Sequence, residues 1–364
     1  MFVALPLAAE IGLPERSKID EVTGAKGAYT ADEDVYRVTF PRTDVKVTVE
    51  GRSMHPFLGL TSWAAFTPDA HGGLMVMGDL VLFEDEVNAV MSAALEGGLE
   101  VTALHNHFFF ESPRVMFMHI GGMGTAAKLA GAVKKALDQV KVIRGARAQP
   151  AVQFAGLAVP EANSITAAAI DAILGVKGQG NAGMYKALIG RKAQMHGKTV
   201  GNQMGVNTWA AFAGSDENAF VDGDFAMTEG ELQPVLKALR QAGINIVAIH
   251  NHMTHEEPQY VFLHYWGKGN AATLARGLRK ALDTQQTAVR AGNVVFICEH
   301  GAAVERGLAE RAISRGTAPD AAFAAGVMAG LKGTPQRVAA ADLVGAGRVV
   351  TFAVKLPEGM SARV

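Results

Sequence analysis

Hydrophobic and polar positions alternate in the same order in two separate stretches of the chain. In the first stretch, residues 74–83 form an apolar run typical of a buried strand. The next segment carries Val87, Val90 and Leu95 at helical spacing, with acidic residues in its first turn that favour a helix N-terminus. The predicted elements are a strand at 74–83, a helix at 84–95, strands at 101–107 and 115–120, and a helix at 125–137.

The second stretch repeats this pattern. It predicts a strand at 220–227, a helix at 229–239, strands at 244–252 and 260–265, and a helix at 271–282. Residues 98–138 align with residues 243–283 without a gap, at an offset of 145, and nineteen of the 41 positions are identical. An internal repeat of this length indicates a duplication. We expect repeats at 15–150 and 165–300, followed by a C-terminal extension at 301–364.

The order of elements predicts an α+β fold made of two tandem β-α-β-β-α repeats. Their sheets are expected to be mixed or antiparallel, with helices packed on one side. Two such repeats commonly pack about a pseudo-twofold axis, and we expect that here. Outside the repeats, the pattern predicts a strand at 152–159, a helix at 302–313 and a strand at 349–355.

Composition narrows the classes of function. The 364 residues carry a formal net charge of -1 without a basic block, so we expect no nucleic-acid partner and no polybasic membrane patch. No apolar run approaches the ~18 residues of a membrane span. The single cysteine excludes an intramolecular disulfide and a thiolate zinc site, whereas 11 histidines are present. Any bound metal is therefore expected to have imidazole and carboxylate ligands.

Six of the histidines belong to one motif that occurs in both repeats. The spacing is H-N-H-x3-E-x-P-x3-F-x-H in each. The candidate metal ligands are the three histidines and one glutamate of each copy: His105, His107, Glu111 and His119, and His250, His252, Glu256 and His264.

The motif can bring its polar side chains together. Alternate residues of a strand share a face, so His105 and His107 should project the same way, about 6.6 Å apart at their Cα atoms. A hairpin centred near Pro113 would place His107 opposite His119. Three imidazoles and a carboxylate suit Zn²⁺, Mn²⁺ or Fe²⁺, and the donor types do not separate these metals.

Two other interpretations of the motif stay open. The histidines could form a metal-free polar or catalytic site, or a buried network that sets strand register. Asp79 and Asp224 precede predicted helices, so helix capping is favoured over a role in orienting a ligating histidine.

The second repeat is the more polar of the two. His255 and Glu257 replace Phe110 and Ser112 beside the motif. If only one copy is active, this difference favours the second, with Glu256, Glu257 and His255 as candidate catalytic residues.

The sequence is compatible with several functions. One is a divalent-metal-dependent hydrolase or lyase, in which the metal polarises a carbonyl or activates water. The alternatives are a non-catalytic module that binds a small molecule or a partner through the histidines, and a structural role. Two similar motifs are discounted. The residues that name the HNH nucleases are dispersed over a ββα unit, and basic residues are not concentrated here. Helices of about 12 residues on both sides of the motif argue against a cupin barrel.

Several further motifs support a family resemblance. They are the segments at 36–42 (YRVTFPR), 62–66 (SWAAF) and 77–81 (MGDLV), together with the two His-Asn-His segments. With these segments in this order, the chain resembles the LppY/LpqO family, which is named after mycobacterial lipoproteins and has no known function. The resemblance implies export or lipid anchoring for many members. This chain has no clear signal peptide or lipobox cysteine, so we expect a soluble, cytoplasmic protein as the sequence stands, or an exported one if a signal peptide has been removed.

Overall fold

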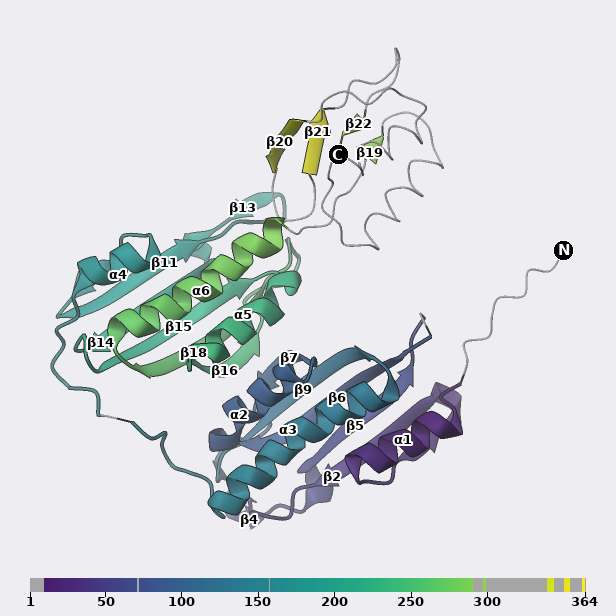
Figure 1. Ribbon diagram of the computed structural model, residues 1–364. Coiled ribbons are helices and arrows are strands. Elements are labelled where there is room, and N and C mark those ends of the chain that lie inside the picture. Colours follow the sequence, from purple (N-terminus) through teal and green to yellow (C-terminus); the bar gives the residue numbers. More distant parts are fainter. Residues whose placement is uncertain are drawn as a thin grey trace. The chain divides into compact units, whose positions relative to one another are not determined.

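A computed structural model describes residues 10–70, 72–156 and 158–290, and four short strands in the C-terminal region. Contacts divide the chain into two compact units, 1–281 and 282–364. The first unit contains the first predicted repeat and the second predicted repeat as far as residue 281 (Figure 1).

The first repeat interleaves three α-helices with antiparallel strands. Its helices are α1 (Leu13–Thr23), α2 (Glu84–Glu96) and α3 (Ala126–Ala146). Its main strands are β1 (Ala28–Thr30), β2 (Val35–Pro41), β5 (Thr61–Pro68), β6 (Leu74–Phe83), β7 (Glu100–His105) and β9 (Val115–Gly124). Three two-residue strands, β3 (Thr48–Val49), β4 (Arg52–Ser53) and β8 (Glu111–Ser112), form a separate small sheet.

The second repeat has the same succession. Its helices are α4 (Ala167–Leu174), α5 (Glu229–Gln241) and α6 (Ala271–Arg290). Its main strands are β10 (Gln179–Asn181), β11 (Met184–Gly190), β14 (Asn207–Gly214), β15 (Ala219–Met227), β16 (Asn245–His250) and β18 (Val261–Gly269). The small sheet here is β12 (Ala193–Met195), β13 (Lys198–Val200) and β17 (Glu256–Glu257).

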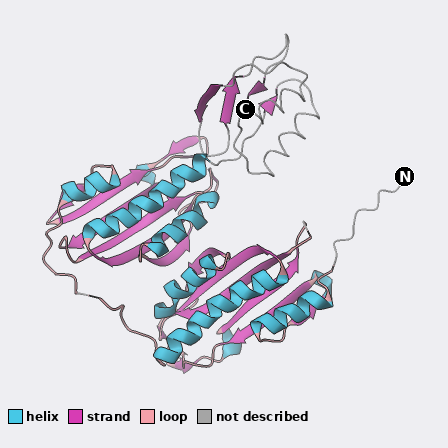
Figure 2. Ribbon diagram, in the orientation of Figure 1, coloured by secondary structure: helices cyan, strands magenta, loops and turns pink. Residues whose placement is uncertain are grey.

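The main strands of both repeats belong to one twelve-stranded sheet. Its order is β1-β2-β5-β6-β9-β7-β16-β18-β15-β14-β11-β10, so the second half lists the equivalents of the first half in reverse. All pairings between its neighbouring strands are antiparallel. In each repeat the helices lie over one face of the strands (Figure 2). The predicted α+β class with antiparallel strands is confirmed.

Reciprocal side-chain contacts join the two repeats. Strands β7 and β16 meet at Leu104 and Ile249. The Asn88 side chain of α2 donates to the carbonyl oxygen of Ile246 and accepts from its N–H, at 3.3 and 2.8 Å. Gln233 of α5 makes the same two hydrogen bonds to Val101, at 2.9 and 3.0 Å. Because these positions differ by the repeat offset of 145, each repeat satisfies the backbone of the other in the same way.

The face opposite the helices is covered locally by the chain segment that carries the small sheet. In the first repeat, Val45, Val47 and Leu60 of this segment pack against alternate residues of β6 and β9, such as Phe83 and Phe117. In the second repeat, an equivalent cluster contains Val200, Val206 and Phe262. The histidine motifs follow β7 and β16 beside these clusters, so the small sheets help to position them.

A buried ion pair closes the start of one central helix in each repeat. Arg42 contacts Glu86 at 2.8 Å, and Arg191 contacts Glu231 at 2.5 Å. Each glutamate also accepts a hydrogen bond from the backbone N–H of the residue that precedes its helix, Phe83 or Thr228. This hydrogen bond from the N-cap residue to the glutamate stabilises the start of the helix, where the preceding strand ends.

Three predictions lie outside the repeats. The predicted strand at 152–159 is wrong, since the described residues of that segment are irregular. Phe154 of this segment packs against Trp266, with ring centroids 5.6 Å apart, whereas Val152 is exposed. In the C-terminal unit, β21 (Val350–Ala353) lies within the predicted strand at 349–355 and pairs with β20 (Ala339–Leu343), while β19 (Ile297–Cys298) pairs with β22 (Ala362–Arg363). The predicted helix at 302–313 lies outside the described residues.

Candidate metal centre

Four polar side chains of the second repeat converge from three adjacent strands. Asp224 of β15 is the direct cross-strand partner of His264 on β18. His264 in turn pairs with Ala248 of β16, next to a register shift that follows Ile246. His250 is the last residue of β16, and His252 follows two residues later. Neighbouring strands therefore deliver the carboxylate and the imidazoles to one place on the sheet.

The donor atoms of this cluster are close enough to share one ion. Single ligand atoms of Asp224, His250 and His264 lie within 4.8 Å of one another. Nε2 of His252 lies 3.1 Å from Nε2 of His250 and 3.0 Å from Oδ2 of Asp224. Ligands at about 2.0–2.2 Å from a zinc ion stand roughly 3 Å apart from one another. The two contacts of His252 are close to that separation, and the ligand atoms of Asp224, His250 and His264 lie within 4.8 Å of one another.

The electrostatic surroundings keep one imidazole neutral. Burial, followed by the neighbouring charges of His264 and His252, lowers the pKa of His250 to about 4. His250 is therefore in its metal-binding, unprotonated form at pH 7. Burial also raises the pKa of Asp224, and this outweighs the opposite effect of His264 and His252.

Two buried polar atoms of the cluster have no hydrogen-bond partner among the described residues. They are Oδ1 of Asp224 and Nδ1 of His250. Unpaired buried polar atoms are costly, and they are rare outside sites that bind an ion, a water molecule or a ligand. The Asp224 side chain is only 2 % exposed. The orphaned carboxylate oxygen thus fits a bound cation better than a purely structural network.

The first repeat holds a related but different arrangement. Nε2 of His105 lies 3.1 Å from Nε2 of His119, whose cross-strand partner is Asp79. The His107 ring stacks on Phe117, with centroids 3.4 Å apart. Burial, with the charge of His105, lowers the pKa of His107, while Asp79 opposes that shift. The same residue types meet here, but among the described residues the close carboxylate–histidine group occurs in the second repeat.

The predicted hairpin register is wrong. His105 pairs with Phe117, and Ala103 pairs with His119, so His107 does not face His119. The reason is that the chain does not turn back directly at Pro113. Strand β8 (Glu111–Ser112) leaves the hairpin and pairs with β3 instead. The rings of His105 and His119 still come into contact, because these residues lie at neighbouring positions of the adjacent strands β7 and β9.

The motif glutamates occupy a different place from the one expected. Glu256 lies on β17, and its Oε1 accepts from the N–H of Tyr260 at 3.0 Å, while its Oε2 is buried without a partner. Glu111 lies on β8, 3.8 Å from Arg114. Neither glutamate belongs to the close donor group found among the described residues.

The two additional catalytic candidates lie next to Glu256. His255 adopts a positive φ of 70°, and its ring centroid lies 5.9 Å from that of His196. Glu257 is exposed and pairs through its backbone with Gln194 of β12. His255 and Glu257 therefore lie at the small sheet of the second repeat, and His196 is a further polar residue beside them.

The carboxylate that joins the histidines was not expected. Asp79 and Asp224 are not helix caps, because β6 and β15 continue to Phe83 and Met227 and the capping carboxylates come from Glu86 and Glu231. The signal that could have revealed Asp224 is the repeated Gly-Asp pair, which lies in the middle of a buried strand in both repeats. A buried acid in a strand interior requires a partner.

The fold and this cluster define a duplicated α+β protein with a candidate metal centre. The family described as Domain of Unknown Function (DUF1259) matches residues 17–139 and again residues 168–284. The chain belongs to this family, and the two matches support the duplication. The family description names no activity. The resemblance to the LppY/LpqO family stays a prediction, since none of the matches names it.

Other matches are distant. No curated protein matches the sequence. EtuB from Clostridium kluyveri is 10% identical with a TM-score of 0.19, covering 72% of this chain and 92% of its own. The trimeric shell protein MSM0271 from the RMM microcompartment is 13% identical with a TM-score of 0.17, covering 60% and 85%. A trimeric microcompartment shell protein, PduB, is 12% identical with a TM-score of 0.16, covering 71% and 90%. Likeness at this level carries no argument about fold or function.

Hydropathy gives one further finding. Among the described residues, none of the helices combines the length and the apolar character needed to cross a membrane.

Proposed function

We propose that the second repeat binds one divalent metal ion through Asp224, His250 and His264, with His252 as a fourth ligand. The observation that carries this proposal is the buried Asp224 carboxylate, which faces imidazole nitrogens while one of its oxygens has no partner. Nitrogen and carboxylate donors suit Zn²⁺, Mn²⁺ or Fe²⁺. These ligands differ from the motif set in one respect, since Asp224 takes the place of Glu256.

The reaction class that such a site supports best is metal-assisted hydrolysis or elimination. A metal held by one carboxylate and two or three imidazoles can polarise a carbonyl group or activate water. Glu256, Glu257 and His255 are the candidate acid–base groups, because all three belong to the segment that follows the ligands His250 and His252. The unpartnered Oε2 of Glu256 is compatible with that role.

The repeat organisation is part of the same proposal. Two domains at 15–150 and 165–300 are related by a pseudo-twofold axis between β7 and β16, and the extension at 301–364 lies outside the duplication. The reversed strand order and the reciprocal contacts of Asn88 and Gln233 support this relationship. We propose that the second repeat carries the active site and that the first is a weaker or vestigial copy.

Metal titration of the full chain tests the proposal. Protein stripped with a chelator should bind about one equivalent of Zn²⁺ or Mn²⁺ tightly by calorimetry, and the metal should raise its melting temperature, because a ligand that binds only the folded state stabilises it. Hydrolysis of a panel of ester, amide and lactone substrates should then depend on added metal. Absence of binding would contradict the metal site, whereas binding without turnover would favour a non-catalytic binding module.

A further inference from the structure

Trp209 lies on the same face of the sheet as the candidate metal centre. It is the direct cross-strand partner of Asp224, which in turn is the partner of His264. Direct partners in an antiparallel pair share one face, with Cβ atoms about 4.5–5.5 Å apart. Phe262, two residues before His264, packs against the small sheet, so this is the face opposite the helices. The half-buried indole of Trp209 is therefore one strand away from the proposed carboxylate ligand.

A positive charge lies over this indole. Nζ of Lys186, an exposed residue of β11, lies 4.1 Å from the ring centroid of Trp209, within the range of a cation–π interaction. Among the described residues, Lys186 forms no ion pair. The exposed Asp222 lies on the same face, but β14 separates it from Lys186, because both residues pair with Ala211 from opposite sides. The ammonium group is therefore accessible to an anionic ligand.

The first repeat contains the same arrangement. The guanidinium carbon of Arg37 on β2 lies 4.2 Å from the ring centroid of Trp63, and Trp63 is the direct partner of Asp79. Arg37 and Lys186 each pair with the alanine two residues after the tryptophan of the adjacent strand. The residue type of the cation differs, whereas its charge and its place over the indole are the same. A cation beside the buried aspartate is therefore a property of the repeated unit.

The charges at this place favour an anionic ligand. A divalent metal bound by Asp224 and neutral imidazoles has a net charge of about +1, and Lys186 adds a second positive charge nearby. One ammonium group supplies a single charge and up to three donors, which suits a carboxylate. Phosphate monoesters carry about -1.5 to -2 at pH 7, and they are commonly held by a bidentate arginine or by the N–H groups of a helix N-terminus. A single lysine therefore favours a carboxylate.

We propose, on the basis of the proposed metal site, that the substrate of this site is a small molecule with a carboxylate group. Lys186, supported by the indole of Trp209, binds this carboxylate while the reacting group of the substrate lies at the metal. Because Trp209 and Asp224 are adjacent across the strands, only a few bonds separate the carboxylate from the reacting group. Lys186 is a residue that binds and orients the substrate.

Matched hydroxamates test this proposal by calorimetry on the zinc-loaded full chain, with the zinc content measured before and after titration. The hydroxamate group binds the metal in each probe, so the neutral butanohydroxamate and pentanohydroxamate measure the metal site alone. The monohydroxamates of succinate and glutarate have the same chain lengths and add a carboxylate. At least one of them should bind about fivefold or more tightly than its neutral counterpart. This advantage should decrease as salt is raised, because ion pairs near the surface are screened.

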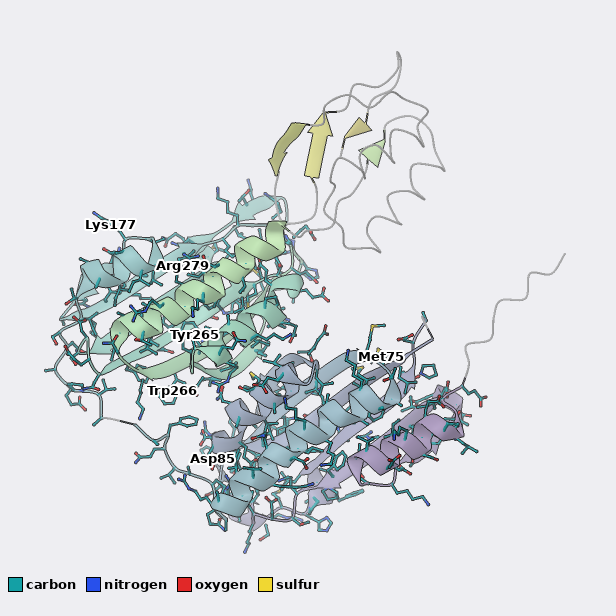
Figure 3. The ribbon with its side chains drawn as sticks, in the orientation of Figure 1. Met75, Asp85, Lys177, Tyr265, Trp266 and Arg279 are labelled. Carbon is teal, nitrogen blue, oxygen red and sulfur yellow. The ribbon has the colours of Figure 1, made fainter. Side chains whose placement is uncertain are left out.

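Three variants assign the advantage to one side chain. Lys186→Met removes the charge and keeps a side chain of similar length, so the carboxylate probes should bind within about twofold of the neutral ones. Lys186→Arg should retain the advantage, since arginine occupies the equivalent place in the first repeat. The matched control is Lys177→Met, at an exposed lysine that follows α4 (Figure 3), and it should leave the advantage within about twofold. Each variant should bind the neutral hydroxamates like the parent protein, and circular dichroism verifies its fold.

The neutral probes separate a failure of the metal site from a failure of the substrate class. If neither the neutral nor the charged hydroxamates bind, the metal site is wrong and the role of Lys186 falls with it. If the neutral hydroxamates bind and the carboxylates bind no more tightly, or if Lys186→Met keeps the advantage, the metal site stands and the role of Lys186 is overturned. If 3-phosphonopropanohydroxamate binds more than about tenfold more tightly than succinate monohydroxamate, the substrate carries a phosphate and the carboxylate class is overturned.

Discussion

Nε2 of His252 lies 3.0 Å from Oδ2 of Asp224, and this contact connects the repeated histidine motif with an aspartate outside it. Asp224 on β15 is paired with His264 on β18, and β18 is in turn paired with β16, which ends at His250. This strand order brings Asp224 close to the residues that follow β16. In the first repeat the close contact is between two imidazoles, His105 and His119, whereas the positions equivalent to His252 and Asp224 are His107 and Asp79. The two repeats have thus kept the same residues but arranged them differently.

The first prediction distinguishes the two candidate carboxylate ligands. Asp224→Asn should weaken Zn²⁺ binding by about 100-fold, because it removes the charged donor of the cluster. Glu256→Gln should change it by less than about threefold, since Glu256 is held by Tyr260 and is not in the donor group. Calorimetric titration of both variants measures this. If Glu256→Gln weakened Zn²⁺ binding more than Asp224→Asn did, Glu256 would be the carboxylate ligand.

The second prediction compares the repeats through a matched pair of variants. His250→Ala should abolish tight binding of the first metal equivalent, with a loss of about 100-fold or more. His105→Ala, at the equivalent position, should leave that equivalent within about threefold, because the carboxylate–histidine group lies in the second repeat. Competitive titration with a zinc-sensitive dye resolves both values. Equal losses in the two variants would mean that the repeats bind metal alike.

The third prediction concerns the buried ion pair at the start of α5. Glu231→Gln should lower the free energy of unfolding by about 3 kcal/mol, because Arg191 is left without its charged partner in a mostly buried position. The control Glu229→Gln changes an exposed acid in the same helical turn and should cost less than about 0.5 kcal/mol. Urea denaturation of both proteins provides the comparison. Similar costs would show that the pair does not anchor the helix.

The fourth prediction concerns the join between the repeats. Asn88→Ala removes both hydrogen bonds to the backbone of Ile246 and leaves its polar groups unpaired, so it should cost about 1–3 kcal/mol. Gln233→Ala should have a similar effect through Val101. Hydrogen exchange should show faster opening of β7 and β16 in either variant. Unchanged protection of both strands would contradict a join that depends on these amides.

Much of the fold could be predicted because the core elements have strong local patterns. The predicted strand at 74–83 coincides with β6, and the predicted helix at 84–95 differs from α2 by one residue. The duplication was visible because the repeats align without a gap over the motif. The long-range features could not be predicted from local patterns. The pairing of β7 with β16 depends on side chains such as Asn88, whose partners lie far along the sequence.

The candidate site was predictable in part. Spacing alone grouped His250, His252 and His264, because strand periodicity places alternate residues on one face. Spacing could not identify Asp224, which lies on a different strand and is brought to the site by cross-strand pairing. Glu256 stays a predicted ligand, but the detour through β17 places it outside the close donor group of the described residues. Some residues are brought to a site by cross-strand pairing. Predicting them requires the strand register, which the sequence pattern does not supply.

The most direct test of the metal centre is a crystal structure of the protein loaded with Zn²⁺, with anomalous data collected at the zinc edge. We expect a single strong peak in the second repeat, about 2.0–2.2 Å from a carboxylate oxygen of Asp224 and from imidazole nitrogens of His250 and His264. A peak at another group of residues, or no peak between these three side chains, would contradict it.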